Sequence, residues 1–333
     1  MIIETHSYPR AALIGNPSDG YFGKTIAFVF KNFSAKVQLY HTPELEIIPE
    51  RMDVDRFENI HDLGQKVSAN GYYGGLRLIK AAIKVFYNYC QSEKIQLDER
   101  NFTIRYCSDI PLRLGLAGSS AIITACFKAL MEFYGVTIPN AILANLVLSV
   151  ENKELGIAAG LQDRVAQAYE TPVYMDFDKS FMDKNGYGEY IPLNVMELPK
   201  LYIAFRRNLS EGTEVLHNNL RARYNIGEQV VIDAMNEWAD LTVKFRIAME
   251  KRDEDRMAHL INRNFDLRRS IVKIEQGNIE MVEIARSLGA SSKFTGSGGA
   301  IIGTYKDDIM YDSLVKTFAT KNIEVIKPDI VIS

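Results

Sequence analysis

The chain has 333 residues, 47% of them hydrophobic and 24% charged, which is the balance of a globular protein long enough for two domains of ordinary size. Its 39 basic and 42 acidic residues leave a formal charge of -3, so the charge gives no reason to expect nucleic acid or an anionic membrane as a partner. The N-terminus lacks the basic and apolar regions of a signal peptide, and no apolar run approaches the roughly 20 residues of a membrane span, so we expect a cytoplasmic protein.

The cysteines and histidines carry little functional signal. Cys90, Cys107 and Cys126 are odd in number, contain no C-x-x-C pair and lie among apolar residues, which favours reduced thiols in the core. The five histidines show no metal-ligand spacing. We therefore expect structural or surface roles for both residue types.

The N-terminal part predicts a β-rich start followed by a long helix. Residues 10–14 form a short apolar strand, and residues 15–20 are a cluster of turn-forming residues. Two further strands are predicted over 28–33 and 35–40. Apolar residues then recur at helical intervals over 71–90, which predicts an amphipathic helix entered through a glycine-rich turn.

A strand over 102–107 leads into a glycine-rich loop, residues 110–121, which precedes an amphipathic helix that ends near Gly135. Glycines allow close approach of the backbone, and the first N–H groups of a helix lack internal partners, so such a loop suits phosphate. Its spacing excludes a Walker A loop. Taken alone, the loop is also compatible with an ordinary capped turn into a core helix.

The middle of the chain predicts a helix over 142–155, a glycine-bearing turn at 160–163 that opens a short helix, and a strand over 173–177. The composition becomes polar and rich in glycine over 178–190. We therefore expect a domain boundary near residue 195, which divides the chain into domains of residues 1–195 and 196–333.

The C-terminal domain is predicted to open with a strand over 201–205 and to continue with helices over roughly 211–288. It then alternates strand, strand, helix, strand, with these elements expected around Ser292 and over 301–304, 311–320 and 323–326. A second glycine-rich loop, residues 293–300, lies between the first two of these strands. By itself this loop is equally a β-turn in a hairpin.

Three small-residue loops therefore occur in order along the chain, at residues 10–19, 111–121 and 295–299. In this order they resemble the three motifs of the GHMP kinases, the galactokinase, homoserine, mevalonate and phosphomevalonate kinase superfamily. The resemblance implies a two-domain α+β fold, with an N-terminal domain similar to ribosomal protein S5 domain 2 and a ferredoxin-like C-terminal domain. It also implies that ATP binds in the groove between these domains.

Within the superfamily the sequence resembles the glucuronokinases of plants over nearly its whole length. The stretches that carry this narrower resemblance are residues 15–23, 71–75, 154–165 and 262–269. The second motif has one residue more between Leu116 and its two serines than the usual G-L-G-S-S, and the third lacks a glycine of the usual T-G-A-G-G-G. Glucuronokinases share both departures.

The resemblance implies that Asp163 is the catalytic aspartate, whose carboxylate takes the proton from the attacking hydroxyl or orients it. Arg10 matches the basic residue of the first motif, and its guanidinium beside Asp163 would keep that carboxylate ionised and neutralise the transferring phosphoryl group. The alternatives are an aspartate that caps the following helix and a surface arginine.

The nucleotide is expected to lie on the second and third motifs. The expected cofactor-binding residues are Pro111, Gly115, Leu116, Ala117, Gly118, Ser119, Ser120, Ala121, Gly296, Ser297 and Gly298. Ser120 and Glu151 are expected to supply oxygen ligands to Mg²⁺. Glu154 is an alternative to Glu151, and Glu151 is alternatively part of a solvated helix face.

The resemblance assigns sugar binding to Asp19, with Tyr73 and Gly74 as further candidates. A sugar that carries a carboxylate also needs a cation, and a guanidinium pairs with a carboxylate through two parallel hydrogen bonds. Arg164 is one candidate for this partner, and Arg113 and Arg268 are others. The sequence does not choose among the three.

The implied activity is a sugar-1-kinase that uses ATP and Mg²⁺ to phosphorylate the anomeric hydroxyl of D-glucuronate. Galacturonate, fucose or a heptose phosphate are alternative acceptors within the superfamily, and a nucleotide- or sugar-sensing protein without catalysis is an alternative of another class. The expected partners are small molecules only, ATP and a sugar acid. We expect a monomer or a homodimer.

Overall fold

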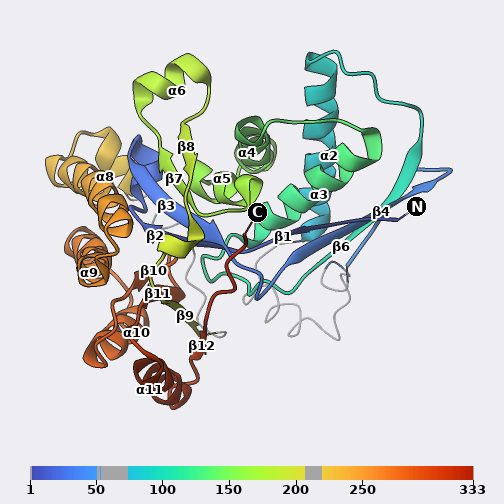
Figure 1. Cartoon of the computed structure of the whole chain (residues 1–333). Coiled ribbons are helices and arrows are strands. Elements are labelled where there is room, and N and C mark those ends of the chain that lie inside the picture. The colour runs from blue at the N-terminus through green and yellow to red at the C-terminus, as the bar shows by residue number, and fades with distance from the viewer. Residues whose placement is uncertain (1, 51–52, 54–73, 207–219, 333) are drawn as a thin grey trace, which may run out of the picture.

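The computed structural model describes residues 2–50, 53, 74–206 and 220–332. These residues form three four-stranded sheets with helices packed between and around them (Figure 1). No helix among them is long and apolar enough to cross a membrane. The expected α+β fold is confirmed.

The first sheet has the strand order β1-β4-β6-β5. Its strands are β1 (Ile2–Ser7), β4 (Ala35–Thr42), β5 (Glu46–Ile48) and β6 (Asn101–Ser108). Neighbouring strands are antiparallel, except that β5 runs parallel to β6. Alternate residues of β4, among them Val37 and Leu39, are buried beneath α3 (Gly118–Tyr134), which packs in turn on α2 (Gly75–Ser92).

The second sheet is antiparallel, with the order β2-β3-β7-β8, and its first three strands in this order are almost entirely buried. Its strands are β2 (Arg10–Ile14), β3 (Lys24–Val29), β7 (Val173–Asp176) and β8 (Glu189–Pro192). Along β3, Ala27 and Val29 belong to one apolar core, whereas Ile26 and Phe28 belong to another. Because α5 (Leu161–Tyr169) packs on one side and α8 (Gln229–Glu250) on the other, the strands are apolar almost throughout.

The third sheet is antiparallel, with the order β10-β11-β9-β12. Its strands are β9 (Leu201–Phe205), β10 (Lys293–Phe294), β11 (Ala300–Thr304) and β12 (Glu324–Ile326). In chain order this is second, third, first, fourth, which is the strand order of a ferredoxin-like sheet. The helices α10 (Gln276–Ser287) and α11 (Asp308–Ala319) lie on it.

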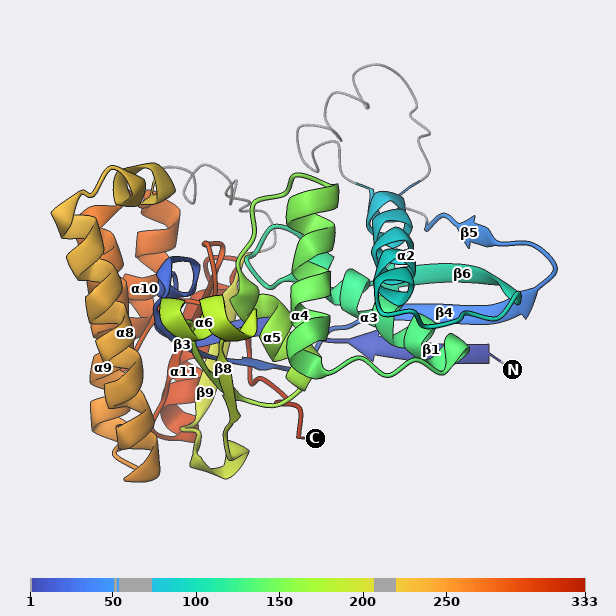
Figure 2. The same cartoon turned by 90° about the horizontal axis from the view of Figure 1, so that it is seen from above.

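The helices α8 and α9 (Glu254–Ile271) connect the second and third sheets. They run side by side along one end of the molecule (Figure 2). The helix α8 contacts β2 and β3, and α9 contacts β2, β10 and β11. The fully buried Trp238 of α8 belongs to the same apolar core as Phe28 of β3 and Ile203 of β9, so one core spans the second and third sheets.

The remaining described elements are short. They are η1 (Ser18–Tyr21), α4 (Asn140–Ser149), one π-helical turn η3 (Val150–Glu154), α6 (Lys179–Asn185) and η4 (Val195–Glu197). The expected boundary near residue 195 falls in the connection between β8 and β9. It stays a prediction, because the shared core crosses it.

Several predicted elements end at different residues in the structure. The strand predicted over 28–33 is β3, which begins four residues earlier, and the helix predicted over 142–155 is α4 followed by η3. The strand β1 was not predicted, because it buries Thr5 and Ser7 as well as Ile3 and so shows no apolar alternation. The elements β5, α6 and β8 are too short for a periodic pattern.

The cysteines correct one further expectation. Cys90 and Cys126 are buried, as expected, but Cys107 is exposed because it lies on the outward face of β6. All three thiols are free.

The end of the chain returns to the second sheet. Phe30, directly after β3, forms a β-bridge with Ile330, and the Val331 N–H donates to the Val29 carbonyl at 3.0 Å. The Val331 side chain is 6% exposed, whereas that of Ile332 is 69% exposed. The last described residues, which follow β12, therefore attach the chain to the end of β3.

We expect Val331→Ala to lower the free energy of unfolding by about 1–2 kcal/mol, because it removes two buried methyl groups. Ile332→Ala is the matched control and should change stability by less than about 0.5 kcal/mol, since its side chain is exposed. Urea denaturation of the three proteins measures the difference. Equal stabilities would show that the C-terminal residues do not pack on β3.

Candidate active site

The Arg10 side chain joins the three glycine-containing loops. Its Nη2 atom lies 2.6 Å from Oδ1 of Asp163. Its Nη1 atom donates to the carbonyl oxygens of Gly115, at 3.2 Å, and Thr295, at 2.5 Å. Arg10 is 4% exposed. The alternative of a surface arginine is therefore wrong, and one buried guanidinium holds the second and third motifs beside the aspartate.

Asp163 lies in the first turn of α5, between two arginines. Its Oδ2 atom accepts a hydrogen bond from Nη1 of Arg164 at 3.0 Å, while Oδ1 faces Arg10. The residue that precedes the helix is Gly160, so Asp163 is not the helix cap. Two guanidinium groups and the positive end of the helix dipole favour the ionised carboxylate.

Arg164 is committed to carboxylates of the protein itself. Its Nε atom donates to Oε2 of Glu151 at 2.7 Å, its Nη2 atom contacts the same oxygen, and its Nη1 atom also donates to the Gly160 carbonyl at 2.8 Å. Burial opposes the charge of Arg164, but Glu151 and Asp163 more than offset it and raise its pKa. The structure thus pairs Arg164 with Asp163, where it orients the carboxylate that the sequence resemblance implies to be catalytic.

Glu151 is 2% exposed and lies in the π-helical turn η3. The alternative of a solvated helix face is therefore wrong. Glu154, three residues later, points elsewhere and forms an ion pair with Lys84 of α2 at 2.6 Å. Of the two glutamates, Glu151 is the one that belongs to the Arg164 and Asp163 cluster.

Asp19 reaches this cluster from η1, in the first motif. Its Oδ2 atom lies against Gly160, where an added Cβ would be only 2.6 Å away, so a larger residue there would displace the Asp19 carboxylate. Burial and the nearby Asp163 carboxylate raise the pKa of Asp19 to about 7, while Arg10 and Arg164 act in the opposite direction. Asp19 and Asp163 therefore face the same small region of the protein.

The second motif forms an irregular loop that ends at the N-terminus of α3. Arg113, Gly115 and Ala117 have φ of 58°, 65° and 62°, so every second residue takes the left-handed conformation. Such alternation directs successive N–H groups into one concavity that suits an anion. In the described part of the chain no hydrogen bond uses the N–H groups of Gly118, Ser119 or Ser120, as the first turn of a helix requires.

The side chains of this motif have different surroundings. Leu116 and Ala121 are buried in the core, and Ala121 donates its N–H to the Ala117 carbonyl, so these two residues support the loop. Pro111 and Ser119 are partly exposed beside it. Ser120 is 1% exposed and donates its hydroxyl to the Ala117 carbonyl at 3.1 Å.

The third motif is a hairpin loop between β10 and β11, so the interpretation as a β-turn in a hairpin is correct for its local structure. It also packs directly on the second motif. A Cβ added to Gly296 would lie 2.4 Å from the Gly115 carbonyl oxygen, and one added to Gly115 would lie 3.0 Å from the Ser297 nitrogen. Arg268 of α9 fixes the loop by donating to the carbonyls of Gly296 and Ser297, both at 2.8 Å.

Two residues that position the loops were not predicted from the sequence. Asn264 accepts a hydrogen bond from the Gly15 N–H at 2.8 Å and donates to the Asn16 carbonyl at 3.3 Å. Lys293 is 1% exposed and donates to the Ala12 carbonyl at 2.7 Å. Burial, together with Arg268 and Arg10, lowers the pKa of Lys293 well below its usual value.

Two further residues were predicted to bind the sugar, Tyr73 and Gly74. Tyr73 is outside the described residues. Gly74 directly precedes α2, whose first N–H group, that of Gly75, donates to Asp53 at 2.7 Å. Nothing in the described structure connects Gly74 to Asp19 or Asp163.

The residues expected to bind Mg²⁺ are chemically suited to it. Ser120 donates its proton to Ala117 and keeps the hydroxyl lone pairs, and Glu151 uses Oε2 for Arg164 while Oε1 has no hydrogen bond to any described residue. The described His, Cys, Asp and Glu residues form no cluster of three that could hold a metal by themselves. Such a sparse oxygen set fits a cation that keeps water and phosphate oxygens as its other ligands.

This chain is similar to known kinases in sequence and in architecture. The family model described as the GHMP kinases N terminal domain matches residues 77–171. A solved mevalonate kinase from Methanococcus jannaschii superposes with a TM-score of 0.72 at 19% identity and covers 100% of this chain and 98% of its own. This likeness shows the fold.

Two proteins of Arabidopsis thaliana are similar in sequence over most of their length. Probable glucuronokinase 2 is 45% identical over 308 residues, and glucuronokinase 1 is 44% identical over 306 residues. Each match covers 90% of this chain and 84% of the plant protein. The chain therefore belongs to the glucuronokinase family of the GHMP kinases.

Proposed function

We propose that this protein transfers the γ-phosphoryl group of ATP to the anomeric hydroxyl of D-glucuronate, giving glucuronate 1-phosphate and ADP. The observation that carries the proposal is the position of Asp163. Its carboxylate is held between Arg10 and Arg164, beside Asp19, and Arg10 also contacts the loop that precedes α3. The two Arabidopsis glucuronokinases support the choice of sugar.

The phosphates of ATP would lie on the second motif. The N–H groups of Gly118, Ser119 and Ser120 point out of the first turn of α3, where the helix dipole favours negative charge. Mg²⁺, held by Ser120 and Glu151, would supply charge neutralisation to the phosphate oxygens. The third motif contributes by fixing Gly115, since Gly296 and Ser297 pack on it.

Asp163 would act on the acceptor. The anomeric oxygen forms a bond to the γ-phosphorus, the bond from that phosphorus to the bridging oxygen of ADP breaks, and the hydroxyl proton passes to the Asp163 carboxylate. Arg10 would stabilise the charge on the transferring group, because its guanidinium lies between Asp163 and the phosphate loop. Asp19 would accept hydrogen bonds from ring hydroxyls.

An enzyme that uses ATP and has three free thiols fits a reducing, cytoplasmic compartment.

We expect Asp163→Asn to lower kcat for glucuronate at least about 100-fold while leaving the KM for ATP nearly unchanged, because the variant keeps the shape of the side chain but cannot take a proton. The release of ADP from magnesium-ATP is measured for the natural sequence and for the variant, across a panel of uronic acids and neutral sugars. Asp255→Asn, at an exposed ion pair with Lys306, is the matched control.

The outcomes separate the two parts of the proposal. Unchanged kcat in Asp163→Asn would remove Asp163 from the reaction. Turnover by the natural sequence with a neutral sugar, and none with glucuronate, would reject the substrate and keep the kinase.

The raised pKa of Asp19 gives a prediction about stability. Between about pH 4 and pH 7 the folded protein keeps a proton on Asp19 that the unfolded chain has lost, so this contribution to stability decreases as pH rises from about 4 to about 7 and is lost above that range. Asn does not titrate. Asp19→Asn should therefore match the natural sequence in stability near pH 4 and exceed it above pH 7, by roughly 1–3 kcal/mol, while sugar phosphorylation falls.

Chemical denaturation from pH 4 to pH 8.5 measures this difference, and Asp183→Asn on the exposed surface of α6 controls for the change in net charge. A stability difference that stays constant with pH, or an Asn variant that is less stable above pH 7, would contradict the electrostatic account of Asp19.

A further inference from the structure

A uronic acid brings a carboxylate into the site, and the structure leaves few cations to receive it. Arg164 is occupied by Glu151, Asp163 and the Gly160 carbonyl, and Arg268 by two carbonyls of the third motif. Arg113 lies on the phosphate loop itself. None of these three arginines can turn toward the sugar without giving up contacts that hold Asp163 or the loops, or leaving the phosphates.

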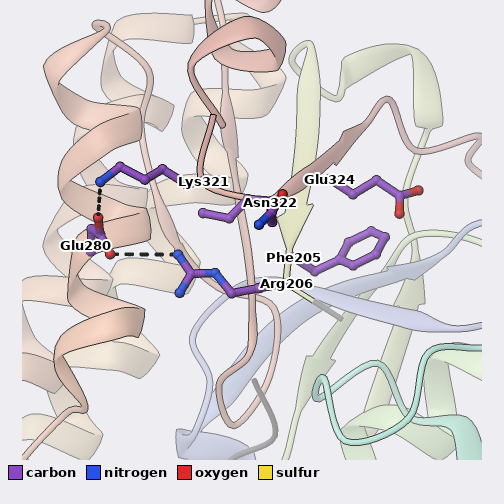
Figure 3. A pocket seen from close by; sticks show the side chains of 7 residues that line it. Phe205, Arg206, Glu280, Lys321, Asn322 and Glu324 are labelled. Carbon is purple, nitrogen blue, oxygen red and sulfur yellow. Dashed lines mark ion pairs between the residues drawn. The ribbon is translucent and has the colours of Figure 1, made fainter. Parts of the chain in front are cut away.

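The cavity at the end of the third sheet does not provide the cation either. It has a volume of about 750 Å³ and is lined by Phe205, Arg206, Glu280, Lys321, Asn322, Ile323 and Glu324 (Figure 3). Its cations, Arg206 and Lys321, both point to Glu280, at 3.7 and 3.1 Å. None of the residues that surround Asp163 lines this cavity.

Arg221 is different, because it lies directly on η1. It belongs to a helical segment, residues 220–225, and its Cζ atom stacks 4.5 Å from the centre of the Tyr21 ring. Its Nη2 atom would lie 3.2 Å from a Cβ added to Gly20. The guanidinium is exposed, and no carboxylate of a described residue lies within 4.0 Å of it.

The aromatic contacts fix the orientation of this guanidinium. Tyr21 is 5% exposed, and its ring also contacts Tyr224, with ring centres 4.8 Å apart. A planar cation stacked on a buried ring loses little side-chain freedom when it binds, so its outward N–H groups are ready for a planar anion. Burial raises the pKa of Tyr21, with Arg221 opposing and Asp19 adding to the shift, so both charges lie within electrostatic reach of the tyrosine.

These contacts connect Arg221 to the Asp163 region through Asp19. Gly20 and Tyr21, which touch Arg221, follow Asp19 in η1, and Asp19 in turn lies against Gly160, at the start of α5. A pyranose ring of a uronic acid carries its anomeric hydroxyl and its carboxylate at different carbons, with further hydroxyls around the ring. One sugar can therefore contact Asp163, Asp19 and Arg221 at the same time.

We propose that Arg221 binds the carboxylate of the acceptor sugar and so determines the preference for a uronic acid over the corresponding neutral sugar. The inference rests on the proposed function and adds the residue that recognises the acid. A bidentate pair of Arg221 with the carboxylate explains why a guanidinium is stacked at η1 rather than paired with an acidic side chain of the described chain. Gly20 keeps the approach to it open.

The test compares Arg221→Gln and Arg221→Lys with the natural sequence, using glucuronate and glucose as acceptors. We expect Arg221→Gln to raise the KM for glucuronate about 10- to 100-fold and to leave the KM for ATP within about twofold. The ratio of kcat/KM for glucuronate to that for glucose should fall by a similar factor. Arg221→Lys should be intermediate, since an ammonium keeps the charge and loses the bidentate geometry.

Arg256→Gln is the matched control, because Arg256 is exposed in the first turn of α9, about 12 Å along the helix axis from Asn264, which holds the first motif. It should leave both KM values unchanged. Calorimetric titration of glucuronate into each folded variant without ATP gives a second readout, and thermal denaturation establishes that each variant is folded.

The experiment distinguishes an error in the role of Arg221 from an error in the proposed function. If the natural sequence phosphorylates glucuronate and Arg221→Gln keeps its KM and its preference over glucose, Arg221 does not bind the carboxylate. If the natural sequence does not phosphorylate or bind glucuronate at all, the proposed function itself is wrong.

Discussion

The arrangement of the site depends on one buried guanidinium. Arg10 faces Asp163, and the same side chain donates to the carbonyls of Gly115 and Thr295, which belong to the two glycine-rich loops. The residue opens β2, a strand that is buried throughout, so its backbone has no freedom to move away. The Asp163 carboxylate, the loop of the second motif and the loop of the third motif are therefore held together by a single charged group.

Most of the buried charged side chains around the site lie beside an opposite charge. Arg10 and Arg164 face Asp163 and Glu151, and this balance lowers the cost of burying all four side chains. Lys293, which has no acidic partner among the described residues, instead has its pKa lowered well below the usual value and serves as a hydrogen-bond donor to Ala12. Asp19, whose pKa is about 7, is the exception that a bound sugar would satisfy.

The sequence predicted the local parts of this site and missed the parts that depend on tertiary contacts. The phosphate loop was recognisable because glycine spacing and a helix start are short-range features, and the resemblance to a kinase family identified Arg10, Asp19 and Asp163. The partners of Arg10 lie 105 and 285 residues away along the chain, so no pattern could reveal that it joins both loops. The same holds for Lys293 and for Arg221, whose proposed role depends on its stacking on Tyr21. The sequence also could not show whether Arg164 is available to the sugar. Its hydrogen bond with Glu151 forms only when η3 and α5 pack together.

The central claim is that the phosphoryl group is transferred to the anomeric oxygen of glucuronate. The most direct measurement is a ³¹P NMR spectrum of the product formed from magnesium-ATP and glucuronate labelled with ¹³C at C1. We predict a new sugar-phosphate resonance that is split by coupling to the labelled carbon, because the phosphate would be attached through the oxygen on C1. A product resonance without this coupling, or the absence of any sugar phosphate, would contradict the account.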